Sequence, residues 1–259
     1  PSLAQALLWR YGAQGPGLAG YSEPGLARAT PEGLTALARH VFARQNAVLV
    51  LDGPVPPGLR LELPDGERRP LPALIPCPQP YPSAYAHFGP EVLLTAEIER
   101  STTAIATARI LGRRVTEGLR HERAVAYSPW ARYERMGTRA LVSIGTDAAT
   151  EHVGTAVADL LGAVSAMADQ GPTSAEVEED RAAAHRWQQD PLAAPSAIWS
   201  AAEDELFGRE PLLPSALRAA VDSVDEEAVR AAARQLRSSL MLGVPVGTAH
   251  AVTTLPWLD

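Results

Sequence analysis

Residues 116–137, TEGLRHERAVAYSPWARYERMG, decide the fold prediction because a helix ends and a strand begins within them. Good helix formers run up to Arg120, a short apolar step follows, and Tyr127 stands seven residues later. We therefore predict that Arg120 lies at the end of a helix and that the chain approaches a strand from Tyr127 onward.

Regular patterns flank this stretch on both sides. Apolar and polar residues alternate from Val92 to Ile98, which is typical of a half-buried strand. Ser101 can then cap a helix with one apolar face. That face comprises Ala104, Ala108, Leu111, Val115 and Leu119. After Gly137, residues 140–146, ALVSIGT, predict a further strand.

The later part of the chain adds three predicted helices and a last strand. Residues 153–164 have helical apolar spacing, and TSAE at 173–176 is a capping box that opens the next helix. We predict a second capping box between Ser223 and Glu226, followed by a helix and a strand over 240–246. These patterns predict the α+β fold class, an antiparallel sheet with helices packed on one face.

Proline density divides the chain. Ten prolines lie between Pro54 and Pro82, a density that neither a helix nor a central strand tolerates. We therefore predict a Pro-rich linker over 54–83 and a domain over 84–259. Residues 1–53 are predicted to be the C-terminal part of a first, related domain.

The relation between the two domains rests on a repeated order of elements. Thr30 can cap a helix that starts at Pro31 and carries an apolar stripe up to Phe42. The apolar run 48–51 then predicts a buried strand. The same helix-then-strand order closes the chain over 223–246, so the two endings are similar to copies of one unit.

Composition excludes several classes of function. The net charge of −7 offers no basic surface, so we predict no nucleic-acid partner. Cys77 is the single cysteine, which rules out an intrachain disulfide. There is no run of eighteen apolar residues and no signal-peptide pattern, so we expect a cytoplasmic protein without a membrane partner.

Three segments together resemble the second domain of the M16 metallopeptidases, the insulinase-like or pitrilysin-like family. They are LRHERAVAYS (119–128), GPTSAEVEEDRAAAHRWQQD (171–190) and VDSVDEEAVRAAARQLRSSLMLGVPVG (221–247). Residues 11–53 are similar to the end of that family's first domain. The resemblance implies a clamshell of two related α+β domains that cleaves peptides in a closed chamber.

The resemblance also implies roles for two residues. Arg120 and Tyr127 match an Arg and a Tyr that the family's second domain extends toward the substrate. A guanidinium and a phenol can both donate hydrogen bonds to a peptide carbonyl and to the oxyanion that develops during hydrolysis. The structural alternative is that Arg120 caps the helix C-terminus and that Tyr127 only packs.

The zinc motif of the family is missing from this sequence. None of the six histidines, at positions 40, 87, 121, 152, 185 and 250, stands in H-x-x-E-H or H-E-x-x-H. We therefore expect no cofactor in this chain and zinc in a partner, a second M16-like chain that carries H-x-x-E-H.

Three interpretations remain open. In the first, this chain is the substrate-binding, non-zinc subunit of a two-chain bacterial peptidase that acts on a precursor or leader peptide. In the second, it is a fragment of a single-chain peptidase. In the third, it is a structural subunit that serves assembly.

Overall fold

The computed structural model describes residues 2–21, 23, 25–51, 53–122, 126, 128–212 and 214–248. Two compact units form within it. The sheet unit contains Pro1–Tyr21, Leu74–Ala184 and Ala219–Asp259, and the second unit contains Ser22–Ala73 and His185–Arg218. The sheet unit therefore includes the first helix of the chain as well as most of the predicted second domain. The predicted domain boundaries at 53 and 84 rest on the similarity of two chain segments, whereas the two units are defined by contacts within the structure. The predicted boundaries therefore stay a prediction.

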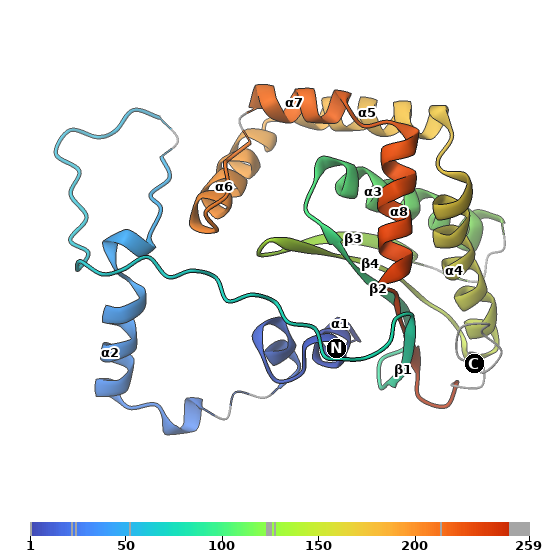
Figure 1. The fold of residues 1–259 in the computed structure, drawn as a ribbon, viewed down its shortest axis with the longest axis horizontal. Coiled ribbons are helices and arrows are strands. Elements are labelled where there is room, and N and C mark those ends of the chain that lie inside the picture. Colours follow the sequence, from blue (N-terminus) through green and yellow to red (C-terminus); the bar gives the residue numbers. More distant parts are fainter. Residues whose placement is uncertain are drawn as a thin grey trace. The chain divides into compact units, whose positions relative to one another are not determined.

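A five-stranded, mostly antiparallel sheet forms the centre of the sheet unit (Figure 1). The strands are β1 (Ser83–His87), β2 (Glu91–Glu99), β3 (Trp130–Met136), β4 (Arg139–Asp147) and β5 (Met241–Pro245). Their order is β1-β5-β2-β4-β3, and only β1 and β5 run parallel. The predicted fold class is confirmed, whereas strand β1 was not predicted.

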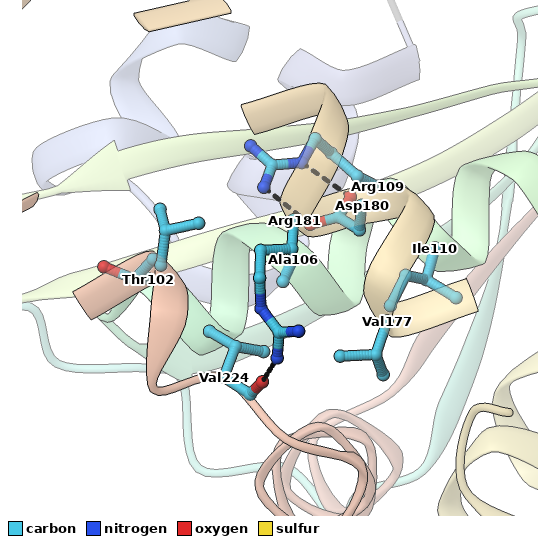
Figure 2. A pocket seen from close by; sticks show the side chains of 9 residues that line it. Thr102, Ala106, Arg109, Ile110, Val177, Asp180, Arg181 and Val224 are labelled. Atoms are coloured by element: carbon cyan, nitrogen blue, oxygen red, sulfur yellow. Dashed lines mark hydrogen bonds and ion pairs between the residues drawn. The ribbon is translucent and has the colours of Figure 1, made fainter. Parts of the chain in front are cut away.

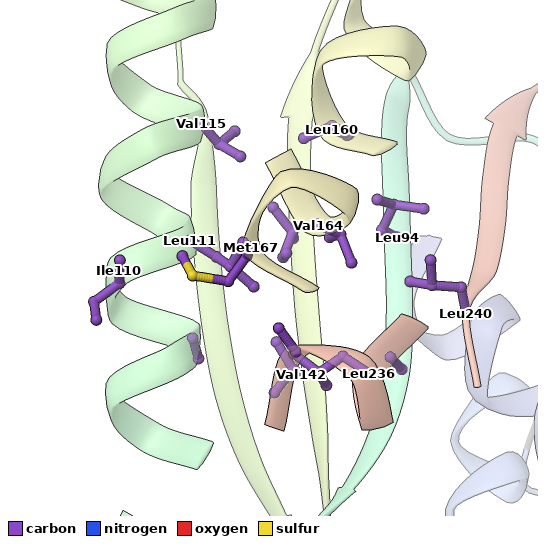
Figure 3. Packing of buried hydrophobic residues seen from close by; sticks show 14 of the residues in the cluster. Leu94, Ile110, Leu111, Val115, Val142, Leu160, Val164, Met167, Leu236 and Leu240 are labelled. Atoms are coloured by element: carbon purple, nitrogen blue, oxygen red, sulfur yellow. The ribbon is translucent and has the colours of Figure 1, made fainter. Parts of the chain in front are cut away.

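Three helices cover one face of this sheet and enclose the main core (Figure 3). They are α3 (Thr102–Thr116), α4 (Val153–Gln170) and α8 (Glu226–Ser238). Leu111, Leu160 and Leu236 extend from these helices into the core and are at most 1% exposed. The apolar faces predicted for the helices are therefore the buried faces.

Two of the three caps predicted for helices of the sheet unit are confirmed. The Ser101 hydroxyl accepts a hydrogen bond from Ala104 N, and Thr173 and Glu176 form the reciprocal bonds of a capping box at α5 (Ser174–Gln188). The predicted box at Ser223 is wrong, because the Asp225 carboxylate caps α8 by accepting from Ala228 N. An Asp directly before the first helical turn is closer to the free amides than Ser223 is.

The other face of the sheet is covered by α1 (Ser2–Tyr11), which corrects the expectation of a half-buried strand at 92–98. Strand β2 is buried on both faces, and Thr95 and Glu97 are at most 9% exposed. Arg10 is 1% exposed and donates to Thr95 O at 3.0 Å and to Ser239 O at 2.9 Å. Tyr11 donates its hydroxyl hydrogen to Glu97, and burial with this carboxylate nearby raises the pKa of Tyr11.

The second unit contains α2 (Pro31–Val41) and α6 (Ala193–Leu206). Thr30 caps α2 as predicted, by accepting from Gly33 N. The strand expected at 48–51 does not form, since a strand requires a hydrogen-bonded neighbour and these residues have none in the described sheet. Residues 54–82 form neither helix nor strand, as their proline content predicts.

Further short elements complete the chain. Helix α7 spans Pro214–Asp222, and neither α6 nor α7 was predicted from the sequence. The 3-10 turns are η1 (Gly15–Gly20), η2 (Leu26–Arg28), η3 (Arg44–Asn46) and η5 (Thr150–His152). None of the helices among the described residues has the length and apolar character that a membrane crossing requires.

Candidate functional site

Arg120 lies on a short π-helical segment, η4 (Glu117–Glu122), that continues α3. Leu119 is 0% exposed and anchors this segment in the main core, while Arg120 itself is exposed. Local π-helical turns are uncommon and often occur at functional sites. The buried leucine thus fixes the backbone directly beside an accessible guanidinium, at the helix end where the sequence predicted it.

Tyr127 lies outside the described residues, so its predicted role stays a prediction. The chain next to it is held at defined points. Ala126 is 9% exposed and contributes to the main core, and Ser128 N donates to Asp147 Oδ1 at 3.0 Å. Ala126 thus ties the chain before Tyr127 to the main core, and Ser128 ties the chain after it to the end of strand β4.

Trp130, the first residue of strand β3, also contacts strand β4. It is paired with Gly145 of β4, and a Cβ on Gly145 would lie 2.6 Å from Trp130 Cζ2. Any larger residue at 145 would therefore displace the indole. The guanidinium of Arg132 in turn lies over the Trp130 ring, 4.8 Å from its centre, a cation–π arrangement.

Arginines on α3 form a second polar cluster, which was not predicted from the sequence. Figure 2 shows Arg109 of this cluster bound to Asp180. Arg109 binds Asp180 of α5 through two hydrogen bonds of 2.9 and 2.7 Å, and Arg113 Nη1 donates to the same carboxylate at 3.1 Å. Arg114 likewise donates two hydrogen bonds to the carboxylate of Glu176. The i, i+4 spacing of Arg109 and Arg113 was the available signal, because it places both on one helix face.

This cluster fixes α5 to α3 and leaves no space for a ligand. The hollow beside it has a volume of about 10 Å³, which is room for about one water molecule. The hydrogen bonds from Arg114, together with those from Thr173, hold the pKa of Glu176 at about 2. We therefore interpret the cluster as structural.

Within the described part of the chain, no three His, Cys, Asp or Glu side chains come together as they would around a metal ion. The described residues therefore do not fit a zinc site. The expectation of zinc in a partner chain stays a prediction.

The sheet and its helix layer make up an α+β fold, and its likeness to solved structures identifies this fold as M16-like. No protein-family model matches the sequence, and no curated protein matches it. Solved structures do match. The inactive domain of an M16 peptidase from Pseudomonas fluorescens superposes with a TM-score of 0.67 at 12% identity, over 93% of this chain and 64% of that one.

Two further structures share the fold. One is the first half of the periplasmic protease PqqL from Escherichia coli, with a TM-score of 0.56 at 12% identity, over 73% of this chain and 47% of that one. The other is the ferredoxin protease FusC, solved as a mutant in complex with Arabidopsis ferredoxin. Its TM-score is 0.56 at 13% identity, over 94% of this chain and 29% of that one. This chain therefore spans less than two thirds of the length of each of these structures.

Proposed function

We propose that this chain is the substrate-binding, non-zinc subunit of a two-chain M16-type metallopeptidase that cleaves peptides in a closed chamber. The observation that carries the proposal is the exposed Arg120 beside the fully buried Leu119, on an M16-like domain. A guanidinium is always charged, and it can hold a peptide carbonyl and stabilise the oxyanion of hydrolysis. Tyr127 would supply a second donor, and the partner chain would hold zinc in H-x-x-E-H.

The substrate in this proposal is a peptide in an extended form, such as a precursor or leader peptide. We place the pair in the cytoplasm, consistent with the use of a single cysteine, Cys77. The chain and its partner together would then enclose the peptide, while neither would cleave it alone.

Reconstitution tests this function. The isolated chain should bind no stoichiometric zinc and should not cleave a fluorogenic peptide library. Addition of an H-x-x-E-H chain encoded with it should produce zinc-dependent turnover and a stable complex. Zinc binding with turnover by the isolated chain would overturn the assignment to a non-zinc subunit.

A structural subunit is the second candidate, and one feature favours it. Helix α2 has no buried residue, and Leu34, Leu37 and Phe42 are each more than half exposed. An apolar surface of this kind is typical of assembly contacts. A complex that forms with the partner but has no peptidase activity under any condition would support this alternative.

A further inference from the structure

Strand β3 is an edge strand at one end of the described sheet. In the order β1-β5-β2-β4-β3, strand β3 is hydrogen-bonded to β4 and to no other described strand. It is seven residues long and none of its residues is fully buried. An edge strand of this length can pair with an extended peptide through its main-chain amides and carbonyls.

The side chains of β3 divide cleanly between its two faces. Ala131 and Tyr133 pack against the main core under α3, and a Cβ on Gly112 of α3 would lie only 3.0 Å from Ala131 Cβ. Trp130, Arg132 and Glu134 alternate with them and face the other side. The edge is therefore held rigidly from the helix side and presents an aromatic, a basic and an acidic residue on the opposite side.

Arg132 gives this edge a charge preference. It is exposed, it stacks on Trp130, and within the described part of the chain it makes no ion pair. Its cross-strand partner is Ser143 on β4. Ser143 is 0% exposed, and its hydroxyl has no hydrogen-bond partner among the described residues. The cross-strand partner of Arg132 in the sheet is therefore a serine and supplies no carboxylate.

We propose that the outer edge of β3 binds an extended segment of the peptide substrate as an added strand, with an acidic side chain of that segment opposite Arg132. Opposite charges that face each other on neighbouring strands attract one another. An acidic residue at this position would therefore lie beside the guanidinium that stacks on Trp130. A basic residue two positions along the peptide would face Glu134. The inference deepens the proposed function, on which it rests for the nature of the ligand.

Binding to the intact 259-residue chain tests the proposal by fluorescence anisotropy. The probe is an eight-residue fluorescein-labelled peptide of alternating Thr and Val with one central Glu, and a matched peptide carries Lys instead. The wild-type chain should bind the Glu peptide about 3- to 10-fold more tightly than the Lys peptide. Arg132→Glu should reverse this preference, whereas Arg218→Glu, an equal charge change at an exposed residue of α7, should not.

Backbone methylation then tests strand addition itself. Two further Glu peptides carry N-methyl groups on alternate amides, one on the odd and one on the even positions. Because only every second amide of an added strand faces its neighbour, one version should lose binding at least about tenfold and the other should bind as before. Equal binding of both versions, or no reversal by Arg132→Glu, would overturn the proposal.

The outcome is separable from that of the proposed function. If the peptide pairs with β3 as described but no partner yields turnover, the edge still binds peptide and the peptidase assignment fails. If the reconstituted pair is active and Arg132→Glu leaves its KM for Glu- and Lys-containing substrates unchanged, the peptidase assignment stands and the β3 site is wrong.

Discussion

The stability of the folded chain depends on pH through Glu176, which binds α5 to α3. Hydrogen bonds from Arg114 and Thr173 lower its pKa from 4.5 to about 2. A carboxyl whose folded pKa is depressed adds stability that is present above its unfolded pKa, near 4.5, and that is lost as the pH falls toward 2. Because solvent screens this partly exposed carboxylate, its contribution at neutral pH is on the order of 1 kcal/mol.

Glu176→Gln should therefore lower the free energy of unfolding at pH 7, and the difference from wild type should shrink between pH 4.5 and pH 2. Urea unfolding at a series of pH values measures this difference. The matched control is Glu178→Gln, whose carboxylate on the same helix is largely exposed. A Glu176→Gln effect that stays constant across the pH range would contradict the assigned cause.

The cap of α8 rests on Asp225 rather than on Ser223. Asp225→Ala removes the acceptor for Ala228 N and should cost about 1 kcal/mol of stability. Ser223→Ala is the matched control and should change stability by less than about 0.5 kcal/mol, since its hydroxyl only donates to Ala220 O. Chemical denaturation of both variants measures the difference, and equal effects would show that the cap is assigned wrongly.

Helix α1 stabilises the sheet from its second face. Arg10→Ala should lower the free energy of unfolding by roughly 2 to 4 kcal/mol, because it leaves the carbonyls of Thr95 and Ser239 without this buried donor. Arg28→Ala, at an exposed arginine of the second unit, is the control and should have little effect. If Arg10→Ala were as stable as wild type, α1 would not be an integral part of the sheet unit.

For the chain as a whole, the sequence predicted what depends on local periodicity. Leu111, Leu160 and Leu236 are buried as the helical apolar spacing indicated, and Ser101 caps α3 as predicted. The alternation at 92–98 located β2 but not its full burial. That burial comes from α1, about 80 residues earlier in the chain.

Long-range contacts explain the other differences. The pairing of Asp180 with Arg109 depends on the placement of α5 on α3, which no local pattern encodes. The run 48–51 has the composition of a strand, but a strand forms only beside a partner. For the candidate site, the sequence placed Arg120 at a helix end and Leu119 on the apolar face, while the π-helical turn that carries both residues was not predicted.

The most direct test of the proposed function is the turnover of the reconstituted pair after Arg120→Ala and Tyr127→Phe. Loss of one oxyanion donor typically lowers turnover by about 10²- to 10³-fold. We expect each variant to show a decrease of this size in kcat, with unchanged assembly and melting temperature, while Arg218→Ala keeps full activity. Full turnover by Tyr127→Phe, or unfolding as the only effect of Arg120→Ala, would contradict the account and favour a structural subunit.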